Sequence, residues 1–105
     1  MRMYRAVHPG EILQEVMEGM GTTVTALAAH LEMNRVILSR LLNGKQNVTA
    51  AIALKLGQAF PNQDAELWLR LQNQYDLAIL RKKRMKAIKP LFGVPAASRV
   101  AVGRG

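Results

Sequence analysis

The sequence of 105 residues contains no cysteine, which excludes disulfide bonds, cysteine-ligated zinc and thiol nucleophiles. It has no apolar stretch close to the roughly 20 residues that a membrane span requires. The first ten residues hold no apolar run, so we expect no signal peptide. These absences lead us to expect a soluble protein of the reducing cytoplasm, with no membrane partner.

Catalytic arrangements are missing as well. His8 and His30 each stand alone, with no HExxH motif or paired carboxylate beside them. The segment Gly19-Met20-Gly21 lacks the strand and the further glycines of a phosphate-binding loop. We therefore expect no enzyme, no metal and no cofactor. His8 is expected to be structural, near the start of the first helix, and His30 to lie at the surface.

Acidic residues are absent from residues 81–105, which contain eight lysines and arginines. Residues 1–80 contain seven basic and seven acidic residues and therefore carry no net charge. The formal net charge of +8 at pH 7 thus belongs entirely to residues 81–105. This distribution differs from that of a uniformly basic nucleic-acid-binding domain.

Apolar residues recur at helical spacing in five segments, and no strand alternation of useful length occurs. Helix starts are predicted at Pro9, after Thr23, after Asn34, at Thr49 and near residues 62–64. The last of these helices can continue through residues 81–86, and Pro90 breaks it at the latest. We predict an all-α, five-helix bundle over residues 1–89 and a flexible basic tail over residues 90–105.

Residues 23–44 show the clearest functional pattern. Two short predicted helices follow one another, the first with Leu27, Ala28 and Leu31 inward and the second with Leu38 and Leu41. The small side chain of Ala28 lets the helices approach closely, and a turn of three to four residues joins them. This is a helix-turn-helix, whose second helix projects and fits a DNA major groove about 12 Å wide.

The pattern Thr23…Leu27-Ala28…Leu31…Ser39-Arg40…Asn43-Gly44 resembles the phage-repressor-like (Cro/C1 or Xre) helix-turn-helix. Three further blocks, residues 8–13 (HPGEIL), 38–45 (LSRLLNGK) and 66–77 (ELWLRLQNQYDL), resemble the HigA family of antitoxins, also called virulence-associated protein I. The resemblance covers residues 5–80. It implies a homodimer that binds a palindromic operator in its own promoter and neutralises a RelE-like toxin that cleaves mRNA on the ribosome.

Carried over by motif position, the resemblance implies a set of DNA contacts. The base-reading candidates are Arg35, Val36, Ser39 and Arg40; Thr23 and Asn34 would cap their helices and touch phosphates, and Lys45 would contact the DNA backbone. Arg35 and Arg40 are expected on the groove-facing side, where each can pair with guanine O6 and N7. Val36 offers a methyl surface to a thymine methyl group.

One position departs from the family pattern. Glu32 occupies the place in the turn where glycine is usual. Either this glutamate takes a positive φ, which side chains other than glycine disfavour, or the turn differs.

Two further surfaces follow from the helical pattern. Trp68, Leu71 and Tyr75 share one face of the fifth predicted helix and are expected to pack in the core or at a dimer interface. Glu11, Glu15 and Glu18 form an acidic face on the first helix, which would suit a basic RNA-cleaving toxin.

The basic run at residues 81–86 has two interpretations: a solvated helix end, or a segment that strengthens DNA binding without sequence preference. The function has alternatives too. A standalone or phage-type repressor would have the same fold but no toxin partner, and a neighbouring gene for a RelE-like toxin would separate the two. An RNA-binding or ribosome-associated protein would bind structured RNA more strongly than an operator.

Overall fold

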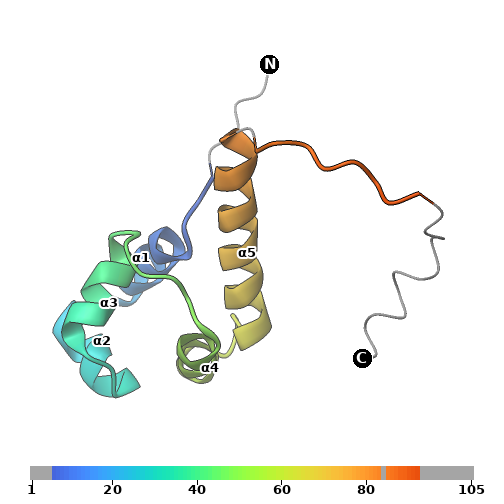
Figure 1. Ribbon diagram of the computed structural model, residues 1–105. Coiled ribbons are helices and arrows are strands. Elements are labelled where there is room, and N and C mark those ends of the chain that lie inside the picture. Colours follow the sequence, from blue (N-terminus) through green and yellow to red (C-terminus); the bar gives the residue numbers. More distant parts are fainter. Residues whose placement is uncertain (1–5, 84, 93–105) are drawn as a thin grey trace.

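The computed structural model describes residues 6–83 and 85–92. Within these residues it contains five α-helices and no strand: α1 (Pro9–Met20), α2 (Val24–Leu31), α3 (Arg35–Leu42), α4 (Ala50–Ala59) and α5 (Ala65–Lys82). Helices α1, α2 and α3 form one group, and α4 lies near the N-terminal end of the longer α5 (Figure 1). The predicted all-α, five-helix fold is confirmed. No helix in this part of the chain is both long and apolar enough to cross a bilayer.

The helices begin where capping residues precede them. The side-chain oxygens of four residues accept a hydrogen bond from a backbone N–H in the first turn: Thr23, Asn34, Thr49 and Asp64. Gly44, just after α3, has a φ of 75°, the left-handed conformation expected where this helix stops. These starts agree with the sequence prediction because caps are local features of the chain.

The predicted extension of the last helix through residues 81–86 is wrong. α5 ends at Lys82, and Lys83 is its C-cap. Residues 80–83 are exposed, so no other element supports a further turn, and like charges four residues apart, as at Lys82 and Lys86, disfavour one. Residues 85–92 are exposed and lead away from the helices (Figure 1). The boundary at residue 89 stays a prediction, and residues 93–105 of the expected tail lie outside the described residues.

The core joins all five helices. Its fully buried side chains include Leu13 of α1, Leu38 and Leu41 of α3, Leu56 of α4 and Trp68 of α5. Glycine permits close backbone approach at two places. A Cβ at Gly10 would overlap the carbonyl oxygen of Leu41, and one at Gly57 would lie 2.7 Å from the backbone nitrogen of Ala65. The start of α1 is therefore seated directly against the end of α3.

His8 caps α1 from a buried position, with 3 % of its surface exposed. Its Nδ1 accepts a hydrogen bond of 2.9 Å from the backbone N–H of Gly10, and its ring meets Tyr75 edge-on at 4.8 Å between centroids. Nε2 is buried and has no hydrogen-bond partner. Burial lowers the pKa of His8 from its ordinary value of 6.5, and the carboxylates of Glu11 and Asp76 oppose the shift. The expected structural role near the helix start is confirmed.

This environment predicts a loss of stability in mild acid. Since the folded-state pKa of His8 is lowered, the unfolded chain takes up a proton below pH 6.5 that the folded chain does not. The free energy of unfolding should fall from about pH 6.5 downward, by at most about 1.4 kcal/mol per pH unit. His8→Asn, which keeps a capping oxygen but cannot titrate, should flatten this dependence in urea unfolding. His30→Asn, at an exposed position, should keep it. The same slope in His8→Asn and the parent would contradict the assignment.

Candidate nucleic-acid interface

The helix-turn-helix is formed by α2, the turn Glu32–Asn34 and α3. Leu27, Ala28 and Leu31 of α2 are buried, and so are Leu38 and Leu41 of α3. The Oγ1 atom of Thr23 accepts from the N–H of Ala26 at 3.1 Å. Inward packing of these side chains leaves the opposite side of α3 exposed to solvent, as a groove-binding helix requires.

The turn has a left-handed residue at its start. Glu32 has φ 54° and ψ 48°, and among the described residues it alone has a positive φ without being glycine. The N–H of Met33 bonds to the carbonyl of Ala28 at 2.9 Å, and the N–H of Glu32 to that of Ala29 at 3.1 Å. This pair of bonds is the Schellman motif, which ends a helix in the left-handed conformation. Of the two alternatives that the sequence left open, a positive φ at Glu32 or a different turn, the structure has the positive φ.

Two apolar side chains are exposed in the first turn of α3. Val36 is 63 % and Ile37 39 % exposed. Asn34 fixes this turn, because its Oδ1 accepts from the N–H of Val36 at 2.8 Å and from that of Ile37 at 3.2 Å. Ile37 was not among the sequence candidates. Its place directly before Leu38, outside the inward pair Leu38 and Leu41, is the signal that could have identified it.

The two arginines of α3 are exposed but have different neighbours. Arg35 donates from Nε to Thr25 Oγ1 at 2.9 Å, toward the first turn of α2. Arg40 donates from a terminal nitrogen to the carbonyl of Lys45 at 3.0 Å, beyond the end of α3. The two arginines are five residues apart, which corresponds to about 140° around a helix, so their side chains leave α3 in different directions. Each guanidinium keeps free N–H donors for a base or phosphate, since arginine has five.

The end of α3 and the loop after it hold the remaining candidates. Ser39 is half-buried, and its carbonyl accepts from Asn43 Nδ2 at 3.0 Å. Lys45 is exposed, and its N–H bonds to the carbonyl of Arg40 at 2.8 Å. Lys45 and Arg40 are therefore joined by two hydrogen bonds, one in each direction, and both side chains are exposed.

Gln72 on α5 secures this loop, a role that sequence reasoning did not identify. The side chain is buried, and its Oε1 accepts from the N–H of Val48 at 2.7 Å. Its Nε2 donates to Asp76 Oδ1 at 2.9 Å and to Asn47 Oδ1 at 3.3 Å. A polar residue on a helix usually indicates surface, so only the tertiary structure identifies this anchor.

Trp68, Leu71 and Tyr75, the residues of α5 expected to pack in the core or at a dimer interface, differ in how deeply they are buried. Trp68 is fully buried, and its Nε1 donates to the carbonyl of Gln63 at 3.0 Å, so its side chain does not reach the surface. Leu71 and Tyr75 are half-buried. Farther along α5, Leu77 and Leu80 are 46 % and 44 % exposed. The outer part of this helix therefore offers apolar surface beyond the core.

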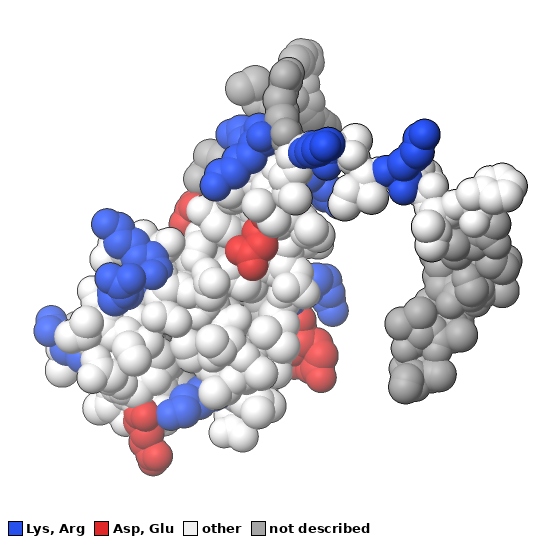
Figure 2. Space-filling model, viewed as in Figure 1, with Lys and Arg blue, Asp and Glu red and all other residues white. Residues whose placement is uncertain are grey.

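Charge is unevenly distributed over the visible surface. Figure 2 shows basic side chains together near the C-terminal end of α5 and along the segment that follows, with another group near the end of α3. The exposed basic residues 81–83, 86 and 89 account for the first group. In residues 6–83 and 85–92, no three histidine or acidic side chains are arranged to hold a metal ion. The exposed side chains of Arg35, Arg40 and Lys45 suit the helix-turn-helix to contacting an anionic polymer.

Comparison with known proteins extends these observations. No protein-family model matches the chain. The chain is 42 % identical over 91 residues to virulence-associated protein A′ of Dichelobacter nodosus, covering 87 % of this chain and 79 % of that protein. It is 40 % identical over 92 residues to antitoxin HigA-1 of Vibrio cholerae, covering 84 % and 86 %. The solved structure of Pseudomonas aeruginosa antitoxin HigA with the higBA promoter matches with a TM-score of 0.75 at 30 % identity, over 84 % of this chain and 100 % of that one.

Proposed function

Because the chain belongs to the HigA family of helix-turn-helix antitoxins, we propose that it is a dimeric, sequence-specific DNA-binding antitoxin. In this proposal it binds a palindromic operator in its own promoter and represses its own operon. It also neutralises a RelE-like toxin that cleaves mRNA. Two copies related by a two-fold axis would place their α3 helices in successive major grooves, as a palindrome requires.

The exposed side of α3 is the observation that carries the DNA-binding part. Its first turn is fixed by Asn34 and presents Val36, and an exposed arginine lies toward each end. We propose that Arg35 and Arg40 pair with guanines and that Val36 contacts a thymine methyl group, with Ser39 beside them. Thr23, Asn34 and Lys45 would contact phosphates and set the register on the duplex.

The dimer would form through the outer part of α5. Leu71 and Tyr75 are half-buried there, and Leu80, which lines a hollow together with Tyr75, adds exposed apolar surface. Trp68 would support this surface from inside the core rather than contact the second copy. Burying such surface also stabilises a domain of this size, which is marginal alone.

Co-purification with the product of the neighbouring gene, followed by footprinting of the shared promoter, tests the proposal. A tight complex and a symmetric footprint are expected. A symmetric footprint without a protein partner would favour a standalone or phage-type repressor. Binding to structured RNA in preference to any promoter duplex would favour an RNA-binding protein and contradict the operator.

Arg40→Ala should weaken binding to the footprinted duplex by about 5- to 150-fold, the equivalent of about 1–3 kcal/mol for a bidentate guanine contact. Specificity should relax at one base pair in each half-site, which competition with single-base variants of the duplex would measure. Arg70→Ala is the matched control, since it removes an exposed arginine from α5, outside the interface. An equal loss on random DNA would show that Arg40 contacts only phosphate.

The acidic side of α1 is the proposed toxin surface. Glu11 caps the helix start, since its Oε2 accepts from the N–H of His8 at 3.5 Å, so reversing its charge would also damage the fold. Glu15 and Glu18 are exposed and lie one turn apart. Reversing both to lysine should weaken toxin binding in calorimetry by about tenfold or more, because an RNA-cleaving toxin is expected to be basic. Gln14→Lys, an exposed neighbour, controls for added charge, and unchanged affinity in the double reversal would reject this surface.

A further inference from the structure

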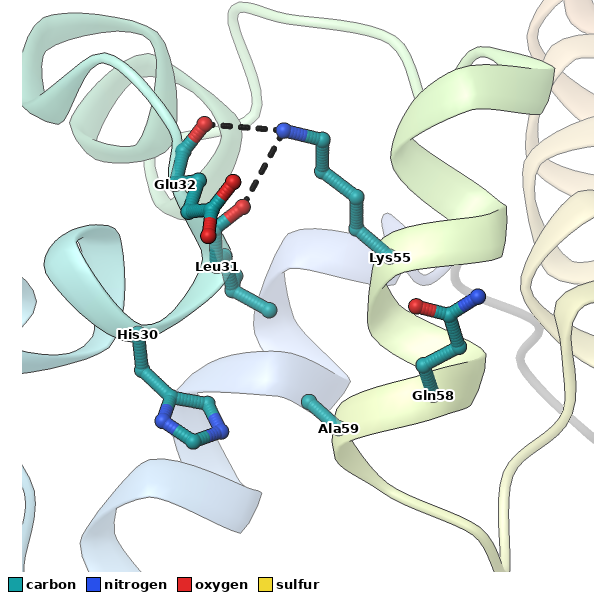
Figure 3. A pocket seen from close by; sticks show the side chains of 6 residues that line it. All are labelled: His30, Leu31, Glu32, Lys55, Gln58 and Ala59. Atoms are coloured by element: carbon teal, nitrogen blue, oxygen red, sulfur yellow. Dashed lines mark hydrogen bonds between the residues drawn. The ribbon is translucent and has the colours of Figure 1, made fainter.

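Lys55 lies on α4, but its ammonium group reaches the end of α2 (Figure 3). Its Nζ donates to the carbonyl oxygen of Leu31 at 3.1 Å and to that of Glu32 at 2.8 Å. Carbonyls at a helix C-terminus lack partners within their own helix. A cation is also favoured there by the helix dipole, and bonds from a charged donor are the stronger ones.

The carbonyl that accepts at 2.8 Å belongs to Glu32, which alone among the described residues has a positive φ without being glycine. Glu32 has a φ of 54°, which costs a side chain with a Cβ more than it costs glycine. Glu32, Met33 and Asn34 are the whole connection between α2 and α3. The conformation of Glu32 therefore sets the direction in which α3 leaves α2.

We propose that Lys55 is a positioning residue for DNA recognition. By holding the carbonyls of Leu31 and Glu32, it keeps the turn left-handed without glycine and so fixes the angle at which α3 meets the operator. This inference rests on the proposed function, because its readout is operator binding. It assigns to α4, outside the helix-turn-helix, a role in sequence specificity.

No other basic side chain lining the hollow around Lys55 could replace it as a donor to the carbonyls of Leu31 and Glu32. The hollow between α2 and α4 has a volume of about 280 Å³ and is lined by His30, Leu31, Glu32, Lys55, Gln58 and Ala59. Figure 3 shows Lys55 directed at the turn, whereas His30 and Gln58 lie farther along the hollow. No second lysine or arginine lines it. Removal of Lys55 would leave both carbonyls to water.

The experiment compares the affinity of the full chain for its footprinted duplex with that for a random duplex of equal length. Lys55→Met should lose about tenfold on the footprinted duplex and about twofold or less on random DNA, since the bonds to the turn are lost and only one charge is removed. Lys55→Arg should retain the preference because it keeps a charged donor. Gln58→Ala, in the same hollow, should behave as the parent. Circular dichroism at the assay temperature confirms that each variant is folded.

A second substitution separates positioning from simple helix capping. Glycine adopts a left-handed conformation without strain, so Glu32→Gly in the Lys55→Met background should recover most of the lost preference. Wild-type preference in Lys55→Met, or a folded double variant without recovery, would overturn the inference. If Lys55→Met does not fold, the double variant and Lys55→Arg are compared with the parent instead. Both should keep most of the parent's preference for the footprinted duplex, and loss of that preference in either folded variant would overturn the inference. A parent protein with no preferred duplex would overturn the proposed function, and this inference with it.

Discussion

Gly10→Ala should destabilise the protein by about 3 kcal/mol, a severe effect for one methyl group. The added Cβ would overlap the carbonyl oxygen of Leu41 and lie 2.9 Å from its carbon. Both partners are backbone atoms, so relief requires α1 and α3 to move apart. Because Leu41 belongs to the helix proposed to enter the major groove, operator binding should weaken along with the fold.

Gly19→Ala is the matched control for this prediction. Gly19 lies on the same helix, and a Cβ there would meet nothing within 4 Å. Alanine has the better helix propensity, so this variant should be more stable than the parent by about 0.5–1 kcal/mol. Urea unfolding followed by circular dichroism would measure both changes. Equal effects at the two positions would show that the contact between α1 and α3 does not constrain Gly10.

Trp68→Ala should cost about 3–5 kcal/mol, much of the stability that a domain of this size possesses. The indole is fully buried and donates to the carbonyl of Gln63, so its loss leaves a cavity and an unpaired acceptor. It also lies in the core beneath the surface proposed for dimerisation. We therefore expect the variant to unfold at much lower urea concentration and to dimerise poorly.

Two further variants test whether the loss of stability in Trp68→Ala comes from the buried indole. Trp68→Phe fills most of the cavity but cannot donate to Gln63, and should be intermediate in stability. Asn73→Ala, at an exposed position of the same helix, should change stability by about 0.5 kcal/mol or less. If Trp68→Ala were as stable as Asn73→Ala, the core would not depend on the indole.

The features that the sequence predicted well depend on near neighbours. Thr23, Asn34, Thr49 and Asp64 cap helices through bonds to residues two or three positions away, so their role is visible in the sequence. The left-handed conformation at Glu32 was one of two alternatives, because the surrounding motif usually has glycine at that position. The predicted last helix was too long. Residues with good helix propensity continue past Lys82, but no other element packs against the chain there, and α5 ends at Lys82.

The features that the sequence did not predict join distant segments. Lys55 meets the turn 23 and 24 residues away, and Gln72 binds Val48 across 24 residues. Both side chains are polar and lie on helices, where solvent exposure is the usual outcome. The sequence was thus enough to propose a set of site residues, but not to predict the contacts that orient them.

The anchor at Gln72 has a consequence for how the protein opens. The N–H of Val48 can exchange with solvent only when its bond to Gln72 breaks, and that side chain is buried against the core. The segment after α3 should therefore not fluctuate as an independent loop, but open in one cooperative unit with α5. Amide hydrogen exchange at Val48 should then be as slow as in the middle of α5, although Val48 lies outside any helix.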